Sequence, residues 1–103
     1  EVSRMEEELT VIAGKLETLL ARHQVSATTV NLKVRFANFQ SITRSVKSFK
    51  PVHTAQDILE HALGLLGKTQ AGERRVRLLG ISLTGFEGNP DFIHPDQQLG
   101  LPF

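Results

Sequence analysis

Hydrophobic residues recur along the chain with two different periods, and the longer period predicts two helices. Between residues 4 and 23 the spacing is three or four, which is typical of an amphipathic helix. This first apolar stripe consists of Met5, Leu9, Ile12, Leu16, Leu19 and His23. A second helix is predicted between Thr54, a favourable N-cap residue, and Gly67, a favourable terminating residue. Its stripe consists of Ile58, Leu59, Ala62, Leu65 and Leu66.

The shorter period is two, and it predicts three strands. In the first, apolar residues from Val30 to Phe36 alternate with polar residues, which is typical of a half-buried strand. The polar set is Thr29, Asn31, Lys33 and Arg35. A turn over residues 37–40 leads into a second strand over 41–49, so the two strands form a hairpin. Residues 74–83 form the third strand.

Two irregularities interrupt the alternation. In the second strand Arg44 has the same parity as the apolar residues Ile42 and Val46, so either that face is mixed or a bulge intervenes. The third strand requires a bulge near Gly80 to bring its two apolar halves onto one face. With that bulge Arg77, Ser82 and Thr84 point outward, as Lys33 and Arg35 do.

The order helix, strand, strand, helix, strand predicts an α+β fold. Two amphipathic helices must bury their stripes against one face of an antiparallel sheet, which makes a two-layer α/β sandwich. The opposite sheet face is then open and basic. We expect the folded domain to span residues 1–85, because Gly88, Asn89, Pro90 and Pro95 mark residues 86–103 as an irregular, flexible tail.

Length, cysteine content and charge distribution narrow the function. The 103 residues suffice for one domain, and the absence of cysteine fits the cytoplasm. No apolar run is long enough to span a bilayer, so we expect no membrane partner. No acidic residue lies between Glu17 and Asp57, whereas six basic residues do: Arg22, Lys33, Arg35, Arg44, Lys47 and Lys50. This segregation indicates either a polyanion-binding face or a merely solvated strand face.

Catalytic and metal-binding motifs are not found in the sequence. The histidines, which are His23, His53, His61 and His94, do not have metal-ligand spacing. There is no glycine-rich phosphate loop and no nucleophile elbow, and the acidic residues lie on helices or in the tail. We therefore expect no catalytic residue, no metal site and no cofactor in this chain.

Three motifs in this order resemble one known domain, the little finger of Y-family translesion DNA polymerases, most closely the bacterial DNA polymerase IV group. The first is Val30–Phe39 followed by Ser41–Ser45, and the second is Val76–Leu83, which resembles the domain's last strand. The third is Gln98–Phe103, which resembles the Gln-Leu-x-Leu-Phe sliding-clamp-binding motif with one proline inserted. The resemblance covers nearly the whole chain.

The resemblance implies DNA binding without sequence specificity. In that family the little finger lies along the major groove of primer–template DNA and contacts phosphates. Carried over to matching positions, the predicted DNA-binding residues are Lys33, Arg35, Thr43, Arg44, Ser45, Lys47 and Arg77. Cations near phosphates release condensed counterions, and hydroxyl groups add hydrogen bonds that carry no sequence information.

The resemblance also implies a second partner, the bacterial sliding clamp (its beta subunit). The predicted clamp-binding residues are Gln98, Leu99, Leu101, Pro102 and Phe103. We expect this peptide to act independently of the folded domain, because no helix or strand pattern competes for it. The alternative is an apolar tail that folds back on its own domain.

Two departures from the family pattern are evident. The catalytic palm domain is absent, so magnesium is expected only there and this fragment should not polymerise DNA alone. The family's little finger also begins with a strand before its first helix, whereas we expect this chain to start at the helix, which would leave a strand edge open to self-association. A different interpretation is a stand-alone adaptor that binds RNA or an acidic protein, with a peptide-docking tail. A third is a structural domain with no nucleic-acid role.

Overall fold

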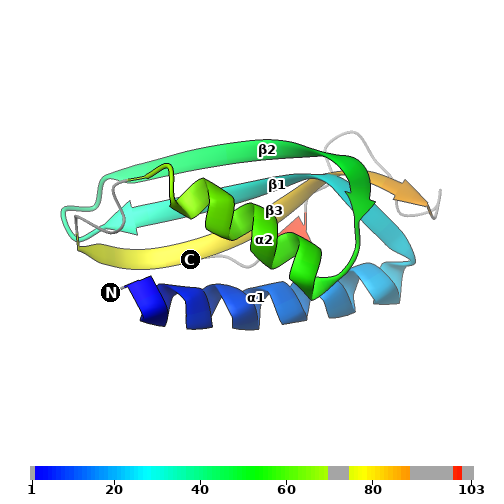
Figure 1. Ribbon diagram of the computed structural model, residues 1–103, viewed down its shortest axis with the longest axis horizontal. Coiled ribbons are helices and arrows are strands. Elements are labelled where there is room, and N and C mark those ends of the chain that lie inside the picture. The colour runs from blue at the N-terminus through cyan, green and yellow to red at the C-terminus, as the bar shows by residue number, and fades with distance from the viewer. Residues whose placement is uncertain (1, 70–74, 89–98, 101–103) are drawn as a thin grey trace.

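A computed structural model describes residues 2–69, 75–88 and 99–100 of the protein (Figure 1). The elements are α1 (Val2–His23), β1 (Val25–Phe36), β2 (Ser41–Val52), α2 (Ala55–Leu66), β3 (Val76–Gly88) and β4 (Leu99–Gly100). The strands form one antiparallel sheet in the order β2-β1-β3-β4. Two helices and three long antiparallel strands make the α+β fold that the sequence predicted.

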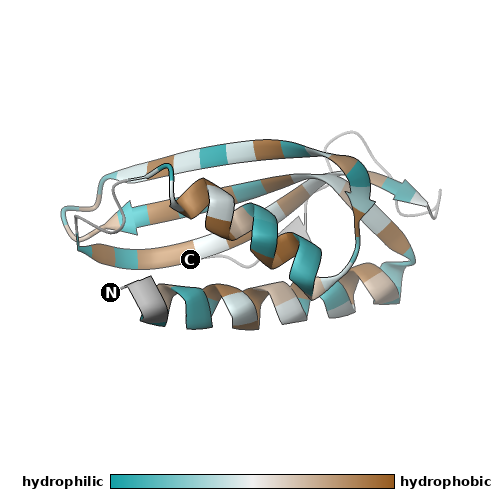
Figure 2. Cartoon of the chain, viewed as in Figure 1, coloured by the Kyte–Doolittle hydropathy of each residue, from teal (hydrophilic) through white to brown (hydrophobic). Residues whose placement is uncertain are grey.

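The core lies between the helices and one face of the sheet. Along β1, Val30, Leu32 and Val34 are fully buried, and the polar residues between them are only half-buried. Figure 2 shows this alternation of hydropathy along the strands. The two helices pack against each other, and on the sheet α1 contacts mainly β3 while α2 contacts β1 and β2, so both helices share one sheet face. None of the described helices covers the opposite face of the three long strands.

Each helix buries an apolar stripe close to the one that its hydrophobic periodicity predicts. α1 buries Met5, Leu9, Ala13, Leu16 and Leu20, so its inward stripe is rotated slightly from the predicted one, and Ile12 and Leu19 flank it. Thr54 caps α2 as predicted, because its Oγ1 accepts a hydrogen bond from the Asp57 backbone N–H at 3.1 Å. Glu17 of α1 accepts a hydrogen bond from the Ala55 N–H at 3.1 Å, which joins the two helices and places a carboxylate at the N-terminus of α2.

A paired kink in β1 and β3 corrects the predicted domain boundary. In β1 the buried residues change parity between Ala27 and Val30, and in β3 they change parity between Leu83 and Phe86. The two changes coincide at Thr28 and Gly85, where Gly85 has a φ of +70° and its carbonyl accepts a hydrogen bond from Thr28 Oγ1 at 3.0 Å. The kink returns Phe86 to the core, where it is 8% exposed. The folded domain therefore continues to Gly88 and does not end at residue 85.

The predicted bulge at Gly80 is wrong. Gly80 pairs with Lys33 in an uninterrupted register that runs from Thr84 to Leu78. The register shifts instead between Arg35 and Phe36, which pair with Leu78 and Val76. The bulge therefore lies between Val76 and Leu78, and Leu79, not Leu78, continues the buried row. Sequence parity alone could not distinguish the two positions.

Two residues of the C-terminal peptide pair with the sheet, which the expected flexible tail did not include. Leu99 and Gly100 form β4, which pairs with Leu83 and Ser82 on the edge of β3 (Figure 1). The expected three-stranded sheet therefore gains a short fourth strand from the tail. This pairing covers only part of the β3 edge, and self-association through that edge stays a prediction.

The kink at Gly85 predicts a large cost for a small substitution. A Cβ at this position would collide with Thr28 Oγ1, and a positive φ is unfavourable for any other residue. Gly85→Ala should lower the free energy of unfolding by about 1–3 kcal/mol, measured by urea denaturation. Gly14→Ala is the matched control: its Cβ would meet nothing within 4 Å inside a helix, so stability should rise by about 0.5–1 kcal/mol. Equal effects of the two substitutions would contradict this account of the kink.

Candidate nucleic-acid interface

The open face of the sheet is a grid of polar side chains that the strand register defines. Residues directly opposite one another in an antiparallel sheet share a face. Reading across β2, β1 and β3, the rows are Ser41, Arg35 and Leu78; Thr43, Lys33 and Gly80; Ser45, Asn31 and Ser82; and Lys47, Thr29 and Thr84. Hydroxyl, amide and cationic groups dominate this surface, which we call the open face.

Asn31 ties the centre of the open face together across all three strands. Its Oδ1 accepts a hydrogen bond from Ser45 Oγ of β2 at 2.6 Å. Its Nδ2 donates to the Ser82 carbonyl at 3.3 Å and to Thr84 Oγ1 at 3.5 Å, both on β3. At one end of the grid Arg35 Nε donates to Ser41 Oγ at 3.1 Å. These bonds hold the polar side chains in fixed positions along the surface.

The charge of the open face has one sign. Lys33, Arg35 and Lys47 contribute positive charge, and none of the grid positions is acidic. Thr43, Ser45 and Lys47 lie on the edge strand and are exposed, whereas the β1 residues are half-buried. An exposed cationic surface with hydroxyl groups between the charges can hold phosphates by electrostatic attraction and by hydrogen bonds.

Arg44 lies on the other side of the sheet from the open face. It pairs with Leu32, a fully buried core residue, so its side chain belongs to the helix-covered face. It is exposed only because β2 is the edge strand, and its Nη1 donates to the Thr43 carbonyl at 3.0 Å. The second strand therefore has a mixed face, which is one of the two possibilities that its sequence allowed. Arg44 as a DNA contact stays a prediction.

Arg77 also lies outside the grid. It occupies the bulge between Val76 and Leu78, so it does not point outward in a row with Lys33 and Arg35 as expected. Its guanidinium stacks on the ring of Phe39, with Cζ 4.6 Å from the ring centroid. This contact joins β3 to the β1–β2 turn, and Phe39 itself is 63% exposed. Arg77 borders the open face without belonging to it.

The structure describes only part of the predicted clamp-binding motif. Leu99 lies in β4 beside β3, whereas Gln98, Leu101, Pro102 and Phe103 lie outside the described residues. Sequence reasoning passed over Asn31, Ser41, Ser82 and Thr84 as site residues, although their alternation with apolar residues was the signal that could have selected them.

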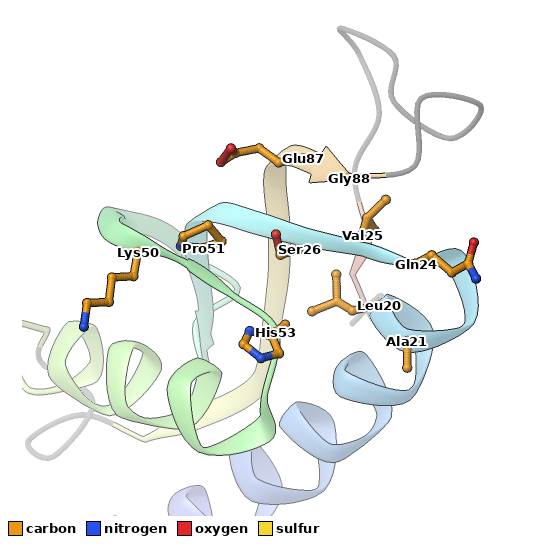
Figure 3. A pocket seen from close by; sticks show the side chains of 10 residues that line it. All are labelled: Leu20, Ala21, Gln24, Val25, Ser26, Lys50, Pro51, His53, Glu87 and Gly88. Carbon is orange, nitrogen blue, oxygen red and sulfur yellow. The ribbon is translucent and has the colours of Figure 1, made fainter.

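A pocket of about 660 Å³ opens where the end of α1 meets the start of β1 and the end of β2 (Figure 3). Its polar lining includes Gln24, Ser26, Lys50, His53 and Glu87.

No group of three or more potential ligands in the described part of the chain is placed to hold a metal ion. None of the helices in the described ranges is long and apolar enough to cross a membrane.

These features define a two-layer α+β domain with one face closed by helices and one basic face open. Residues 1–101 match the model of the impB/mucB/samB family C-terminal domain, and the chain belongs to this family. It is 42% identical over 87 residues, 84% of this chain, to a DNA polymerase IV of Halorhodospira halophila, of which it covers 24%. It is 40% identical over 101 residues, 96% of this chain, to a DNA polymerase IV of Alkalilimnicola ehrlichii, of which it covers 27%.

A solved structure shares the fold. It is a complex of a beta-clamp processivity factor and the little finger domain of PolIV, and it superposes with a TM-score of 0.66 at 24% identity. The match covers 82% of this chain and 76% of that one. The resemblance to the little-finger domain of the DNA polymerase IV group is confirmed. The chain spans about a quarter of the length of the two relatives described above.

The central position of Asn31 predicts that it stabilises the sheet. Asn31→Ala removes its hydrogen bonds to two neighbouring strands and should lower the free energy of unfolding by about 1–2 kcal/mol, measured by urea denaturation. Thr43→Ala truncates an exposed residue of the same face on the edge strand and should change stability by about 0.5 kcal/mol or less. If the two substitutions cost the same, the Asn31 network has no special structural role.

Proposed function

We propose that this domain holds duplex DNA for a translesion DNA polymerase and that its C-terminal peptide tethers the polymerase to the sliding clamp. The observation that carries the DNA part is the open face, which has three cations, no acidic residue, and ordered hydroxyl and amide groups. Relatives named DNA polymerase IV support the proposal, as does a fold shared with a little finger domain.

The dimensions of the open face suit a DNA backbone. From Thr29 to Arg35 the strand advances about 20 Å at about 3.3 Å per residue. One DNA strand presents a phosphate about every 3.4 Å of helix axis, so the grid can follow about six phosphates. Lys33, Arg35 and Lys47 neutralise charge, while Thr43 and Ser45 position the backbone. These groups are suited to phosphate contacts, which carry no sequence information, and the expected binding is therefore independent of sequence.

The tether rests on the sequence of the C-terminal peptide and on the PolIV little finger of similar fold, which was solved in complex with a beta clamp. Leu101 and Phe103 would each contribute about 1.5–3 kcal/mol on burial in an apolar pocket. Gln98 would add side-chain hydrogen bonds worth about 0.5–1.5 kcal/mol each. Ordering of the peptide subtracts from this sum, so the expected affinity is near micromolar, about −8 kcal/mol.

The catalytic chemistry belongs elsewhere in this proposal. The intact protein is a DNA polymerase whose catalytic carboxylates and magnesium ions lie in a palm domain. This chain holds the DNA and tethers the polymerase. Its role is to keep the primer–template DNA in place while the polymerase copies past a lesion.

Salt dependence tests the DNA part. With about three to five phosphates neutralised, the plot of log affinity against log salt concentration should have a slope of about −3 to −5. The measurement is fluorescence anisotropy with labelled duplexes of several sequences at increasing salt. Lys47→Ala should weaken binding to every sequence alike and reduce the slope magnitude by about one. Strong preference for one duplex sequence, or a flat salt response, would refute the proposal.

Arg44→Ala is the matched comparison for Lys47→Ala. Both residues are exposed cations of β2, but they lie on opposite faces of the sheet. If the open face holds the DNA, Lys47→Ala has the larger effect on affinity and slope. A larger effect of Arg44→Ala would assign the DNA to the helix side of the edge strand. Labelled RNA and an unrelated polyanion, titrated in parallel, test the adaptor interpretation, which requires binding at least as tight as that of duplex DNA.

Removal of the C-terminal peptide tests the tether. Deleting residues 98–103 should abolish binding to purified sliding clamp in a calorimetric titration, because the main apolar contacts are lost. The length-preserving variant Leu101→Ala/Phe103→Ala should weaken binding at least about tenfold and leaves β4 in place. Clamp binding that survives the deletion would show that the tail is not the tether.

A further inference from the structure

Among the described residues, the outer edge of β3 has no full-length neighbouring strand, and it lies beside α1. Its opposite edge pairs with β1 from Val76 to Gly88. On the uncovered side the described pairing is confined to Leu83 and Ser82, which meet Leu99 and Gly100 (Figure 1). β4 also approaches α1. The edge therefore already holds the start of the C-terminal peptide.

We propose that this edge is a docking site for the chain's own C-terminal peptide and that docking there competes with clamp binding. The inference rests on the proposed function of the peptide. An extended peptide that adds a strand to a sheet edge gains backbone hydrogen bonds, and its alternate side chains reach pockets on either side. The same backbone groups cannot pair with β3 and with the clamp at one time.

The direction of β4 indicates where the remaining residues would dock. Gly100 stands opposite Ser82, and the two strands are antiparallel. Each further residue towards the C-terminus would therefore stand opposite the next residue of β3 towards the N-terminus. Leu101 would then stand opposite Ile81, and Phe103 opposite Leu79, on the helix-covered face. Pro102 would stand opposite Gly80, at an outer strand position that tolerates a residue without an N–H.

An apolar surface is present at the predicted location. A groove of about 380 Å³ runs between α1 and β3. Its apolar lining is Val11, Ile12, Leu78 and Leu79, and Glu8 and Arg77 complete it. Val11 is 57% exposed, so part of the apolar lining is accessible to a docked side chain. Phe103, opposite Leu79, would cover part of this groove, so register and groove agree on one occupant.

Competition lowers the apparent affinity for the clamp. When only a fraction of molecules has a free peptide, the apparent dissociation constant rises by the reciprocal of that fraction. A free fraction of about one tenth makes the domain bind the clamp about tenfold more weakly than the isolated hexapeptide. Docking of the peptide on the β3 edge therefore lowers the fraction of molecules that can bind the clamp.

A disulfide lock tests docking directly, because the natural chain contains no cysteine. Ser82 and Gly100 are Cα partners, and opposite residues in antiparallel strands lie about 4.5–5.5 Å apart, within the range of a disulfide. The variant Ser82→Cys/Gly100→Cys should form an intramolecular disulfide under mild oxidation, measured by mass spectrometry. Thr43→Cys/Gly100→Cys is the control, since β2 lies at the far side of the sheet, and it should not crosslink.

Clamp titrations of the same variant test the competition. The oxidised form should bind at least about tenfold more weakly than the reduced form, and reductant should restore binding. The free hexapeptide with Gly100→Cys shows whether the clamp accepts cysteine at that position. A second variant, Val11→Glu, places a charge in the groove and should strengthen clamp binding towards that of the free natural hexapeptide. Thr10→Glu, on an exposed neighbouring position of α1, should leave it unchanged.

The outcomes separate the two ideas. Crosslinking no greater than in the control, or crosslinking only between molecules, overturns docking within one chain. A disulfide that forms and leaves clamp binding unchanged overturns the competition. If neither the reduced domain nor the natural hexapeptide binds the clamp, the proposed tether fails and the competition fails with it. The crosslinking yield still decides docking in that case, because it does not depend on the clamp.

Discussion

The burial of one face of β1 is the constraint on which the rest of this structure depends. β1 is a central strand, and the side chains of Val30, Leu32 and Val34 are sealed beneath two helices. Because strand side chains alternate, burying this set forces Asn31, Lys33 and Arg35 onto the other face. The basic surface is therefore a geometric consequence of the core. A shift of one residue in register would exchange the two sets, and the apolar set would lose its burial.

β1 and β3 keep their apolar residues on the core side because both strands kink at the same place. Thr28 and Gly85 interrupt β1 and β3 at the same place, and the hydrogen bond between them fills the gap in the pairing. Beyond the kink the buried parity changes in both strands, so Ala27 and Phe86 still face the core. β2 follows with its own register shift before Val52 pairs with Ala27. The sheet thus continues the core past the kink, where a straight strand would have turned its apolar residues to solvent.

The edges of the sheet have different roles. β2 forms one edge and presents Thr43, Ser45 and Lys47 to the open face, with Arg44 behind them. β3 forms the other long edge and lies beside α1, where a short segment of the tail pairs with it. The proposed DNA contact and the proposed tether therefore lie on different sides of the molecule. A domain built in this way can hold DNA while its peptide exchanges between β3 and a partner.

The sequence by itself determined the elements and the family. Hydrophobic periodicity located both helices and the first hairpin, and capping residues marked the ends of the second helix. Motif order identified the little finger. These signals are local in the sequence, so they can be recognised without the structure. Only the tertiary structure decided on which face of the sheet the residues near a bulge or a kink lie. The pairing of strands decides which sheet face is occupied by Arg44, Arg77 and Phe86. The alternation of apolar and polar residues shows that a bulge is needed but does not show at which residue it lies. The attachment of Leu99 to β3 was also invisible in the sequence, since a two-residue strand is too short for any periodicity and depends on an edge formed by another segment.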